Sequence, residues 1–291
     1  MSPPVGPGAY NAFSAGSYWN KPFPANAPID GSSATYIADA LKMSGTHLQL
    51  TGAPGTSQAY AQPIYWGSVG DKEYTITDSG ITVKVHIPAG ATPASGNDGQ
   101  IVIFDLPNNQ VIGIHMAVHD AATDTWSTSG GLDRYMLDSN GLDNRVAGSD
   151  NPLNFGHRGI PASVRAVRVD EVKAGAINHR LECFWWATAD QHYWPMAGHE
   201  TGKGGVVPEG IVARIKPGVN LDGKGLNPAA RVIAKSLQQY GCTVGDNSGG
   251  NSRVKLEANE AAWTSLGITT DSLAPISWSE WEFVAGGYGQ P

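Results

Sequence analysis

The chain has few charges and no long apolar run, and each of these absences excludes a class of protein. Charged residues make up only 15% of the 291 residues, and the net charge is −7. Because no stripe of Lys and Arg stands out against this acidic balance, binding to a nucleic-acid backbone is not expected. No uninterrupted run of about 18 apolar residues occurs, which argues against a membrane-spanning helix.

Cysteine is also scarce, and a recognisable secretion signal is missing. Cys183 and Cys242 are the only cysteines. Two alternatives stay open for them, one disulfide or two buried free thiols. The start "MSPPVGPGAYNAFSAG" lacks a basic segment followed by an apolar one. We therefore expect either that a signal has been removed or that the protein leaves its cell by another route, such as inside a virion.

Several catalytic motifs are absent as well. The chain contains no G-x-x-x-x-G-K-[ST] loop and no dinucleotide-binding fingerprint, which argues against nucleotide chemistry. It contains no G-x-S-x-G sequence, so a serine nucleophile has no support. We expect no cofactor and no bound metal.

Turn-forming and aromatic residues, by contrast, are plentiful. The chain has 37 Gly, 19 Pro and nine Trp, a composition typical of a loop-rich β fold. Stretches such as "KEYTITD", "ITVKVHIP", "GQIVIFD" and "RLECFWWATA" predict strands. We predict a single mainly β domain over residues 1–291, with an antiparallel β-sandwich or jelly-roll-like core and two or three peripheral α-helices.

Helix signals occur at three places, and the chain begins with an arm. Residues 1–34 are rich in Pro, Gly and Ser and predict an extended N-terminal arm packed on the core through Trp19 and Phe23. The three predicted helices are "SSATYIADALKM", "PASVRAVRVDEVKAGAINH" and "NPAARVIAKSLQQYG". In the last of these, Asn227 is the expected N-cap.

The stretch "GIHMAVHD" at residues 113–120 carries two histidines four positions apart. Its apolar residues alternate with period two, which predicts a strand rather than a metal-binding helix. His115 and His119 then share one open face. A hairpin register that pairs Gly113 with Phe104 places His119 opposite Asp98. This would form a carboxylate–imidazole unit for acid–base chemistry, so the candidate catalytic residues are Asp98, His115, His119, Asp120 and Tyr135.

Two other interpretations of the same histidines stay open. In the first, the two histidines are solvent-facing polar residues on the open side of an antiparallel sheet. In the second, they bind a metal ion, although the sequence specifies no third ligand.

Further polar and aromatic residues resemble those of carbohydrate sites, where a flat ring stacks on a sugar and polar groups bond its hydroxyls. The candidate substrate-binding residues are Arg134, His157, Arg158, Asp190, His192 and Trp194. Hydrolysis of a glycosidic bond needs two carboxyl groups, and no spacing selects a pair. A lyase would instead need a base such as His115 or His119, with Arg134 as neutraliser.

Four stretches, "SYWNKPFPANAPID", "NDGQIVIFD", "IPASVRAVRVDEVKAGAINHRL" and "LNPAARVIAKSLQQYGCTVGDNSGG", resemble an uncharacterised group of extracellular proteins of actinobacteria and their phages. The resemblance implies a secreted or virion-associated location and a polysaccharide partner, and it brings no catalytic residues. We predict an extracellular enzyme that cleaves a polysaccharide, with hydrolysis favoured over elimination. The alternatives are a non-catalytic glycan-binding or structural virion module and a metal-dependent enzyme using His115 and His119. The oligomeric state stays open.

Overall fold

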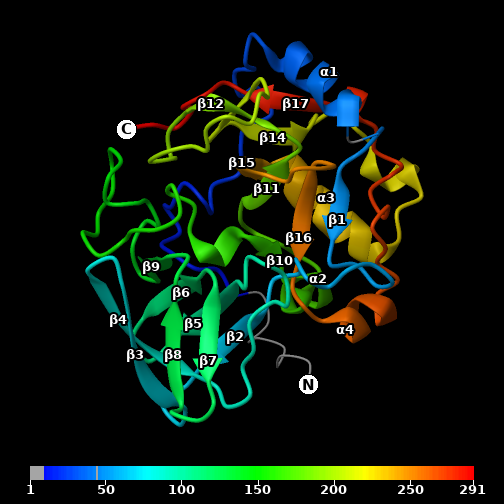
Figure 1. Ribbon diagram of the computed structural model, residues 1–291. Coiled ribbons are helices and arrows are strands. Elements are labelled where there is room, and N and C mark those ends of the chain that lie inside the picture. Colours follow the sequence, from blue (N-terminus) through cyan, green and yellow to red (C-terminus); the bar gives the residue numbers. More distant parts are fainter. Residues whose placement is uncertain (1–9, 44) are drawn as a thin grey trace.

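A computed structural model describes residues 10–43 and 45–291 of the chain (Figure 1). The first nine residues, which contain the start of the predicted arm and of the stretch without a secretion signal, lie outside the described residues. The rest of the arm packs on the core as predicted, because the side chains of Trp19 and Phe23 are buried. Helix α1 (Ser33–Met43) follows the arm where the sequence predicts a helix.

The first half of the chain builds a four-stranded sheet in the order β2-β5-β6-β9. Its strands are β2 (Ile64–Gly67), β5 (Ile101–Asp105), β6 (Gln110–Ile114) and β9 (Leu132–Met136). Two hairpins accompany it, β3 (Lys72–Asp78) with β4 (Ile81–Ile87) and β7 (Ala117–Asp120) with β8 (Thr125–Thr128). Figure 1 shows all of these strands together at one end of the molecule.

Both faces of this sheet are covered. Val111 of β6 belongs to a cluster that includes Trp19 of the arm, whereas its neighbour Ile112 belongs to a cluster that includes Val83 and Trp126 of the hairpins. Successive side chains of a strand point to opposite faces. The two central strands β5 and β6 are therefore buried along their whole length.

The second half of the chain, together with the early strand β1, builds a seven-stranded sheet in the order β1-β16-β11-β15-β14-β17, with β10 also paired to β16. Its strands are β1 (Gln49–Thr51), β10 (Ala166–Val167), β11 (Leu181–Trp185), β14 (Val212–Ile215), β15 (Cys242–Asn247), β16 (Arg253–Leu256) and β17 (Trp281–Val284). Outside it, β12 (Thr188–His192) pairs with β13 (Val207–Glu209).

The prediction of a mainly β fold is confirmed, but the sheets are not purely antiparallel. Strands β1 and β10 both run parallel to β16, and β11 runs parallel to β15. Parallel neighbours need long crossover connections, and the chain supplies them by passing through other elements between these strands. A β-sandwich or jelly roll is not confirmed.

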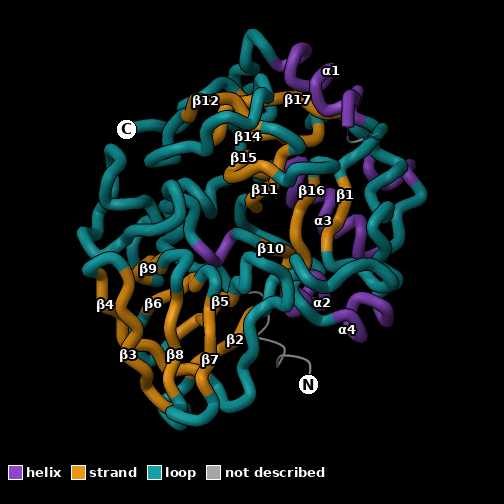
Figure 2. The backbone as a smooth tube through the Cα atoms, in the orientation of Figure 1, coloured by secondary structure: helices purple, strands orange, loops and turns teal. Residues whose placement is uncertain are grey.

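The helices lie against the seven-stranded sheet (Figure 2). Besides α1 they are α2 (Val169–Ala174), α3 (Pro228–Gln239) and α4 (Glu260–Ser265), and the 3₁₀ turns are η1 (Ala162–Val164), η2 (Leu221–Lys224) and η3 (Trp278–Glu280). Helix α3 is as predicted, because the side chain of Asn227 accepts a hydrogen bond from the Ala230 amide at 2.7 Å. Its apolar side packs into the largest core cluster, which also holds the buried free thiols of Cys183 and Cys242.

The prediction of one continuous helix over residues 161–179 is wrong. This segment forms η1, then strand β10, and only then the short helix α2, with Gly175 as its C-cap. Residues 162–172 are all buried, so the segment has no exposed face from which a helical period could be distinguished. The extended backbone is favoured here because β10 completes hydrogen bonding with β16.

The prediction of one strand through "GIHMAVHD" is also wrong. Strand β6 ends at Ile114 and β7 begins at Ala117, in a different sheet. Between them Met116 has a φ of 47°, in the left-handed region that interrupts a strand. His115 therefore lies at the end of an internal strand, whereas His119 lies on an exposed hairpin.

The predicted hairpin register is wrong by two residues. Gly113 pairs with Val102 and not with Phe104, because the turn begins at Leu106, one residue earlier than predicted. His119 is paired with Trp126 across β7 and β8, so it does not face Asp98. The proposed His119–Asp98 unit does not exist in this structure.

Candidate active-site cavity

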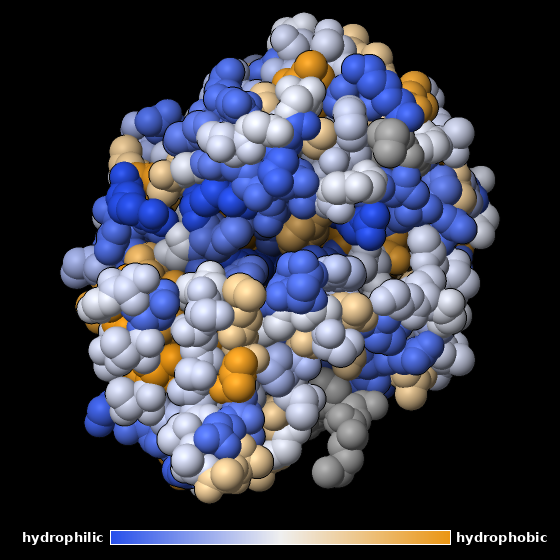
Figure 3. Space-filling model, viewed as in Figure 1, coloured by the Kyte–Doolittle hydropathy of each residue, from blue (hydrophilic) through white to orange (hydrophobic). Residues whose placement is uncertain are grey.

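A cavity of about 450 Å³ opens where the two sheets meet. Strands β1, β11, β15 and β16 form one wall, and the end of β6 with the loops before β2 and β5 forms the other. The space-filling view shows the surface hollowed between these two parts, with hydrophilic side chains around the hollow (Figure 3). Its titratable lining includes Asp98, His115, His157, Arg165, Glu182 and Asp246.

Arg165, which directly follows η1, connects both walls of the cavity. Its Nη2 lies 2.5 Å from Asp133 Oδ2 on β9, and its Nε lies 3.7 Å from Glu182 Oε2 on β11. Its Nη1 lies 3.1 Å from His115 Nε2. Gly113 makes this arrangement possible, because a Cβ there would lie 2.6 Å from Asp133 Oδ2 and 3.2 Å from Arg165 Nη1. The small residue in "GIHMAVHD" therefore accommodates an ion pair and not a ligand.

Two histidines stack at the edge of the cavity. The rings of His115 and His157 lie 5.2 Å apart, centroid to centroid, with an interplanar angle of 16°. Burial, reinforced by the charge of Arg165, lowers the pKa of His115 to about 3. Burial also lowers the pKa of His157. Both rings are therefore neutral near pH 7, and His115 Nε2 accepts the hydrogen bond from Arg165.

Glu182 is the deepest carboxyl group of the cavity. It occupies the second position of β11, where its side chain is 1% exposed. The opposing strand β15 has a bulge at this level, and a Cβ on Gly245 would collide with Glu182 Oε1. Burial raises the pKa of Glu182 to about 7, with Arg165 opposing the shift and Asp246 adding to it. Glu182 therefore carries a proton over much of the neutral range.

Asp246, on the neighbouring strand, is in the opposite electrostatic situation. Burial alone would raise its pKa, but the contact with His157 and the charge of Arg158 hold the pKa well below its usual range. Its Oδ2 lies 3.3 Å from His157 Nε2, and its Oδ1 lies 2.8 Å from Arg158 Nη2. Below about pH 7, the adjacent strands β11 and β15 thus present one protonated and one ionised carboxyl group to the cavity.

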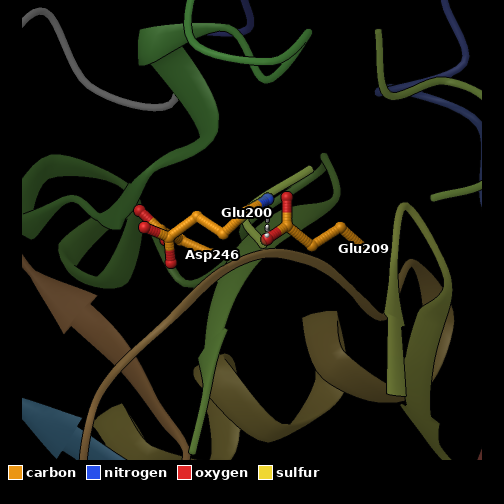
Figure 4. Close-up of side chains that lie close together, drawn as sticks. All are labelled: Glu200, Glu209 and Asp246. Atoms are coloured by element: carbon orange, nitrogen blue, oxygen red, sulfur yellow. Dashed lines mark hydrogen bonds between the residues drawn. The ribbon is translucent and has the colours of Figure 1, made fainter. Parts of the chain in front are cut away.

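Two further carboxyl groups lie behind Asp246. Figure 4 shows Glu200, Glu209 and Asp246 pointing toward one another, with the Glu200 amide donating to Glu209 Oε1 at 3.1 Å. Among the described residues these three are the only group whose oxygens are close enough to ligate a metal ion. Arg158 already supplies a positive charge there, with its Nε 3.2 Å from Glu209 Oε2. Burial raises the pKa of Glu209 to about 7. We therefore interpret this cluster as an arginine-bridged carboxyl group network that orients Asp246.

Four of the residues selected from the sequence come together here. Asp98, His115 and His157 line the cavity, and Arg158 contacts Asp246 from behind. They come from three separate segments of the chain, because His157 and Arg158 are adjacent.

The other predicted catalytic residues lie elsewhere. His119 Nε2 lies 2.9 Å from Asp124 on the exposed hairpin, and Asp120 accepts a hydrogen bond from the Ala122 amide at the turn of that hairpin. Tyr135 is fully buried and donates its hydroxyl hydrogen to Asp143.

Four predicted substrate-binding residues are also outside the cavity. Arg134 lies over the ring of Phe155. Asp190 accepts from the Gly202 amide, and His192 Nδ1 lies 2.7 Å from His199 Nδ1, both in exposed positions. The fourth, Trp194, lies in a separate groove beside the N-terminal arm, with its ring against that of Tyr18.

The residues that sequence reasoning missed share one signal, a charge inside a short apolar stretch. Glu182 stands in "LECFW", Lys255 in "RVKL" and Arg165 in "SVRAV". Charged side chains are almost never fully buried unless they are paired, so such positions are candidates for a polar site. Asp246 had a weaker signal, because "VGDNSGG" also reads as an ordinary turn.

Comparison of the chain with protein-family models, with curated proteins and with solved structures gave no match. Among the described residues, no helix has the length and apolar character needed to cross a membrane. The function is therefore inferred from the cavity and the sequence.

Proposed function

We propose that the protein is a glycoside hydrolase that cleaves a polysaccharide outside the cell, with Glu182 as general acid and Asp246 as its ionised partner. The observation that carries this proposal is the pair of carboxyl groups in one cavity whose surroundings drive their pKa values in opposite directions. Glycosidases use one protonated and one ionised carboxyl group in this way.

The roles follow from the contacts of each group. Protonated Glu182 gives its proton to the oxygen of the glycosidic bond as that bond breaks. The carboxylate left behind faces the guanidinium of Arg165, 3.7 Å away, which stabilises the new negative charge. Asp246 acts on the sugar carbon, either directly as a nucleophile or by activating a water molecule.

The remaining walls suit a sugar. The rings of Tyr60 and Phe184 and the amides of Gln62 and Asn97 line the cavity, and the Tyr60 hydroxyl donates to Asn97 at 2.7 Å. Aromatic faces pack against sugar rings, while amides exchange hydrogen bonds with hydroxyls.

A lyase is the second candidate, supported by the neutral His115 beside Arg165. A neutral imidazole is able to remove the proton next to a uronate carboxyl group while a cation neutralises that group. We rank elimination second because Arg165 is already engaged by Asp133.

The test is incubation with a panel of bacterial and plant polysaccharides, followed by assays of reducing ends and of the ultraviolet absorbance of unsaturated uronates. Hydrolysis releases reducing ends without that absorbance, and elimination produces both. The variants Glu182→Gln and Asp246→Asn should each slow hydrolysis by at least about 10²-fold. Glu257→Gln is the matched control, because burial raises the pKa of Glu257 to about 7 as well, yet its carboxylate accepts from the Val169 amide outside the cavity.

If the chain binds glycans but releases no product from the whole panel, the glycan-binding or virion-module alternative replaces the hydrolase. Equal activity of Glu182→Gln and the parent would exclude the assigned acid. The metal-dependent alternative loses its basis in His115 and His119, because neither belongs to a cluster of possible ligands among the described residues.

The extracellular location is part of the proposal and has its support in the resemblance to secreted and virion-associated proteins. Immunodetection of the protein in culture medium, cell and phage fractions tests it. Recovery from the cell fraction alone would contradict it.

A further inference from the structure

Lys255 places an ammonium group in the cavity without a matching carboxylate. It lies on β16, its side chain is nearly buried, and its residue exposure is 8%. Its Nζ lies over the ring of Phe184, 4.2 Å from the centroid. Among the described residues no ion pair or hydrogen bond is formed by this ammonium. Burying an unpaired charge costs free energy that a bound counter-charge recovers.

Arg253 reinforces this positive site. It precedes Lys255 by two positions on β16, so both side chains leave the same face of the strand, and both line the cavity. The Nε of Arg253 donates to the Asn251 carbonyl at 2.9 Å, and the guanidinium has no carboxylate partner among the described residues. Arg165, in contrast, is committed to Asp133.

The negative groups around Lys255 do not cancel it by contact. Glu182, Asp98 and Asp246 all act on its ammonium through space, but none forms an ion pair with it. Glu182 is protonated over part of the neutral range, which reduces the opposing charge further. In a chain with a net charge of −7, Arg253 and Lys255 thus bring two cations on one face of β16 to this cavity.

We propose that Lys255 and Arg253 form a subsite for the negatively charged substituent of a sugar, so that the substrate is an acidic polysaccharide. The carboxylate of a uronic acid and a sulfate ester share the required chemistry, an anion with several acceptor oxygens. The ring of Phe184 beneath Lys255 gives the sugar that carries the anion an apolar face. This inference rests on the proposed function for cleavage, but the binding it predicts is measured separately.

The experiment measures glycan binding to the Glu182→Gln variant by titration calorimetry, so that no probe is consumed. The probes are oligomers of galacturonate, glucuronate-containing and sulfated oligosaccharides, the methyl ester of the galacturonate oligomer, and neutral oligomers of glucose and xylose. We expect acidic probes to bind and the methyl ester, which differs in its charge, to bind at least about tenfold more weakly. Preference for carboxylated over sulfated probes, or the reverse, identifies the anion.

Charge variants assign the subsite. Adding Lys255→Gln should weaken binding of the acidic probes at least about tenfold, while Lys255→Arg should retain most of it. Lys84→Gln is the control for net charge, since it removes the same charge from the exposed hairpin, where Lys84 pairs with Glu73. Circular dichroism and thermal unfolding establish that each variant is folded.

Three outcomes overturn the inference: no acidic probe binds, neutral and acidic probes bind equally, or Lys255→Gln and Lys84→Gln have the same effect. The two proposals fail separately. Acidic probes that bind at Lys255 without being cleaved by the parent chain contradict the hydrolase and leave the subsite intact. Cleavage of neutral glycans, unaffected by Lys255→Gln, does the reverse.

Discussion

Arg158 holds Asp246 through a contact of 2.8 Å between its Nη2 and Asp246 Oδ1. The same guanidinium reaches Glu209 with its Nε at 3.2 Å. The guanidinium of Arg158 thus contacts both the ionised carboxylate of Asp246 in the cavity and the carboxyl group of Glu209 behind it. This explains how Asp246 stays charged in a half-buried position, and it makes Arg158 a positioning residue for the proposed reaction.

Arg158→Gln should shift the acidic limb of the pH profile of kcat/KM to higher pH. The charge of Arg158 opposes the rise in the pKa of Asp246 that burial would cause, so removing it raises that pKa, by roughly one unit or more. Arg158→Lys keeps a positive charge and should shift the limb less. An acidic limb that is the same in both variants and the parent would show that Arg158 does not set the ionisation of Asp246.

Glu182 should set the basic limb of the same profile. A general acid works only while protonated, and the pKa of Glu182 is raised to about 7, so kcat/KM should fall as the pH rises above about 7. Glu182→Gln should lower kcat by about 10²–10⁴-fold, the usual contribution of a general acid, and remove the basic limb. Glu257→Gln should keep both. A parent enzyme whose activity still rises well above pH 8 would contradict this assignment.

Glu182 should also make stability depend on pH in a defined direction. Its folded pKa of about 7 lies above the ordinary value of 4.5, so the folded state favours the protonated form. The stability contributed by that preference is complete below about pH 4.5 and is lost as the pH rises to about 7. Glutamine cannot ionise, so the difference in Tm between Glu182→Gln and the parent should grow in favour of the variant over this window. A difference that does not change with pH would argue against a raised pKa.

Much of the fold follows from local sequence patterns. The period-two stretches "KEYTITD" and "ITVKVHIP" form β3 and β4, the apolar run of "GQIVIFD" forms β5, and the capped stretch after Asn227 forms α3. These elements are determined by the pattern of apolar residues and by a capping side chain, which act within a few residues. The same reasoning fails for residues 161–179, where residues 162–172 are buried on every side and pairing with a distant strand, β16, favours an extended backbone at Ala166–Val167.

The site was predictable only in part, because it depends on long-range pairing. His115 and His157 were selected from the sequence, but the stacking of their rings requires the end of β6 to meet a loop some forty residues later. Glu182 and Asp246 become neighbours through the parallel pairing of β11 with β15 and through the bulge at Gly245. Neither that pairing nor the left-handed turn at Met116 has a local sequence signal. Buried charges in apolar strands are the clue that would have led to Glu182.

The two histidines of "GIHMAVHD" give a direct comparison, because the turn at Met116 separates their environments. His115 Nε2 accepts from Arg165 Nη1 at 3.1 Å inside the cavity, whereas His119 stacks on Trp126 on the exposed hairpin. Removing an acceptor from a buried charged donor costs about 1–3 kcal/mol. His115→Ala should therefore displace Arg165 and lower kcat/KM by about tenfold or more, while His119→Ala should leave kcat/KM unchanged. Both are measured on any polysaccharide that the parent cleaves, with His115→Asn as a partial restoration of the acceptor. Equal effects of the two alanine variants would mean that the cavity is not the active site.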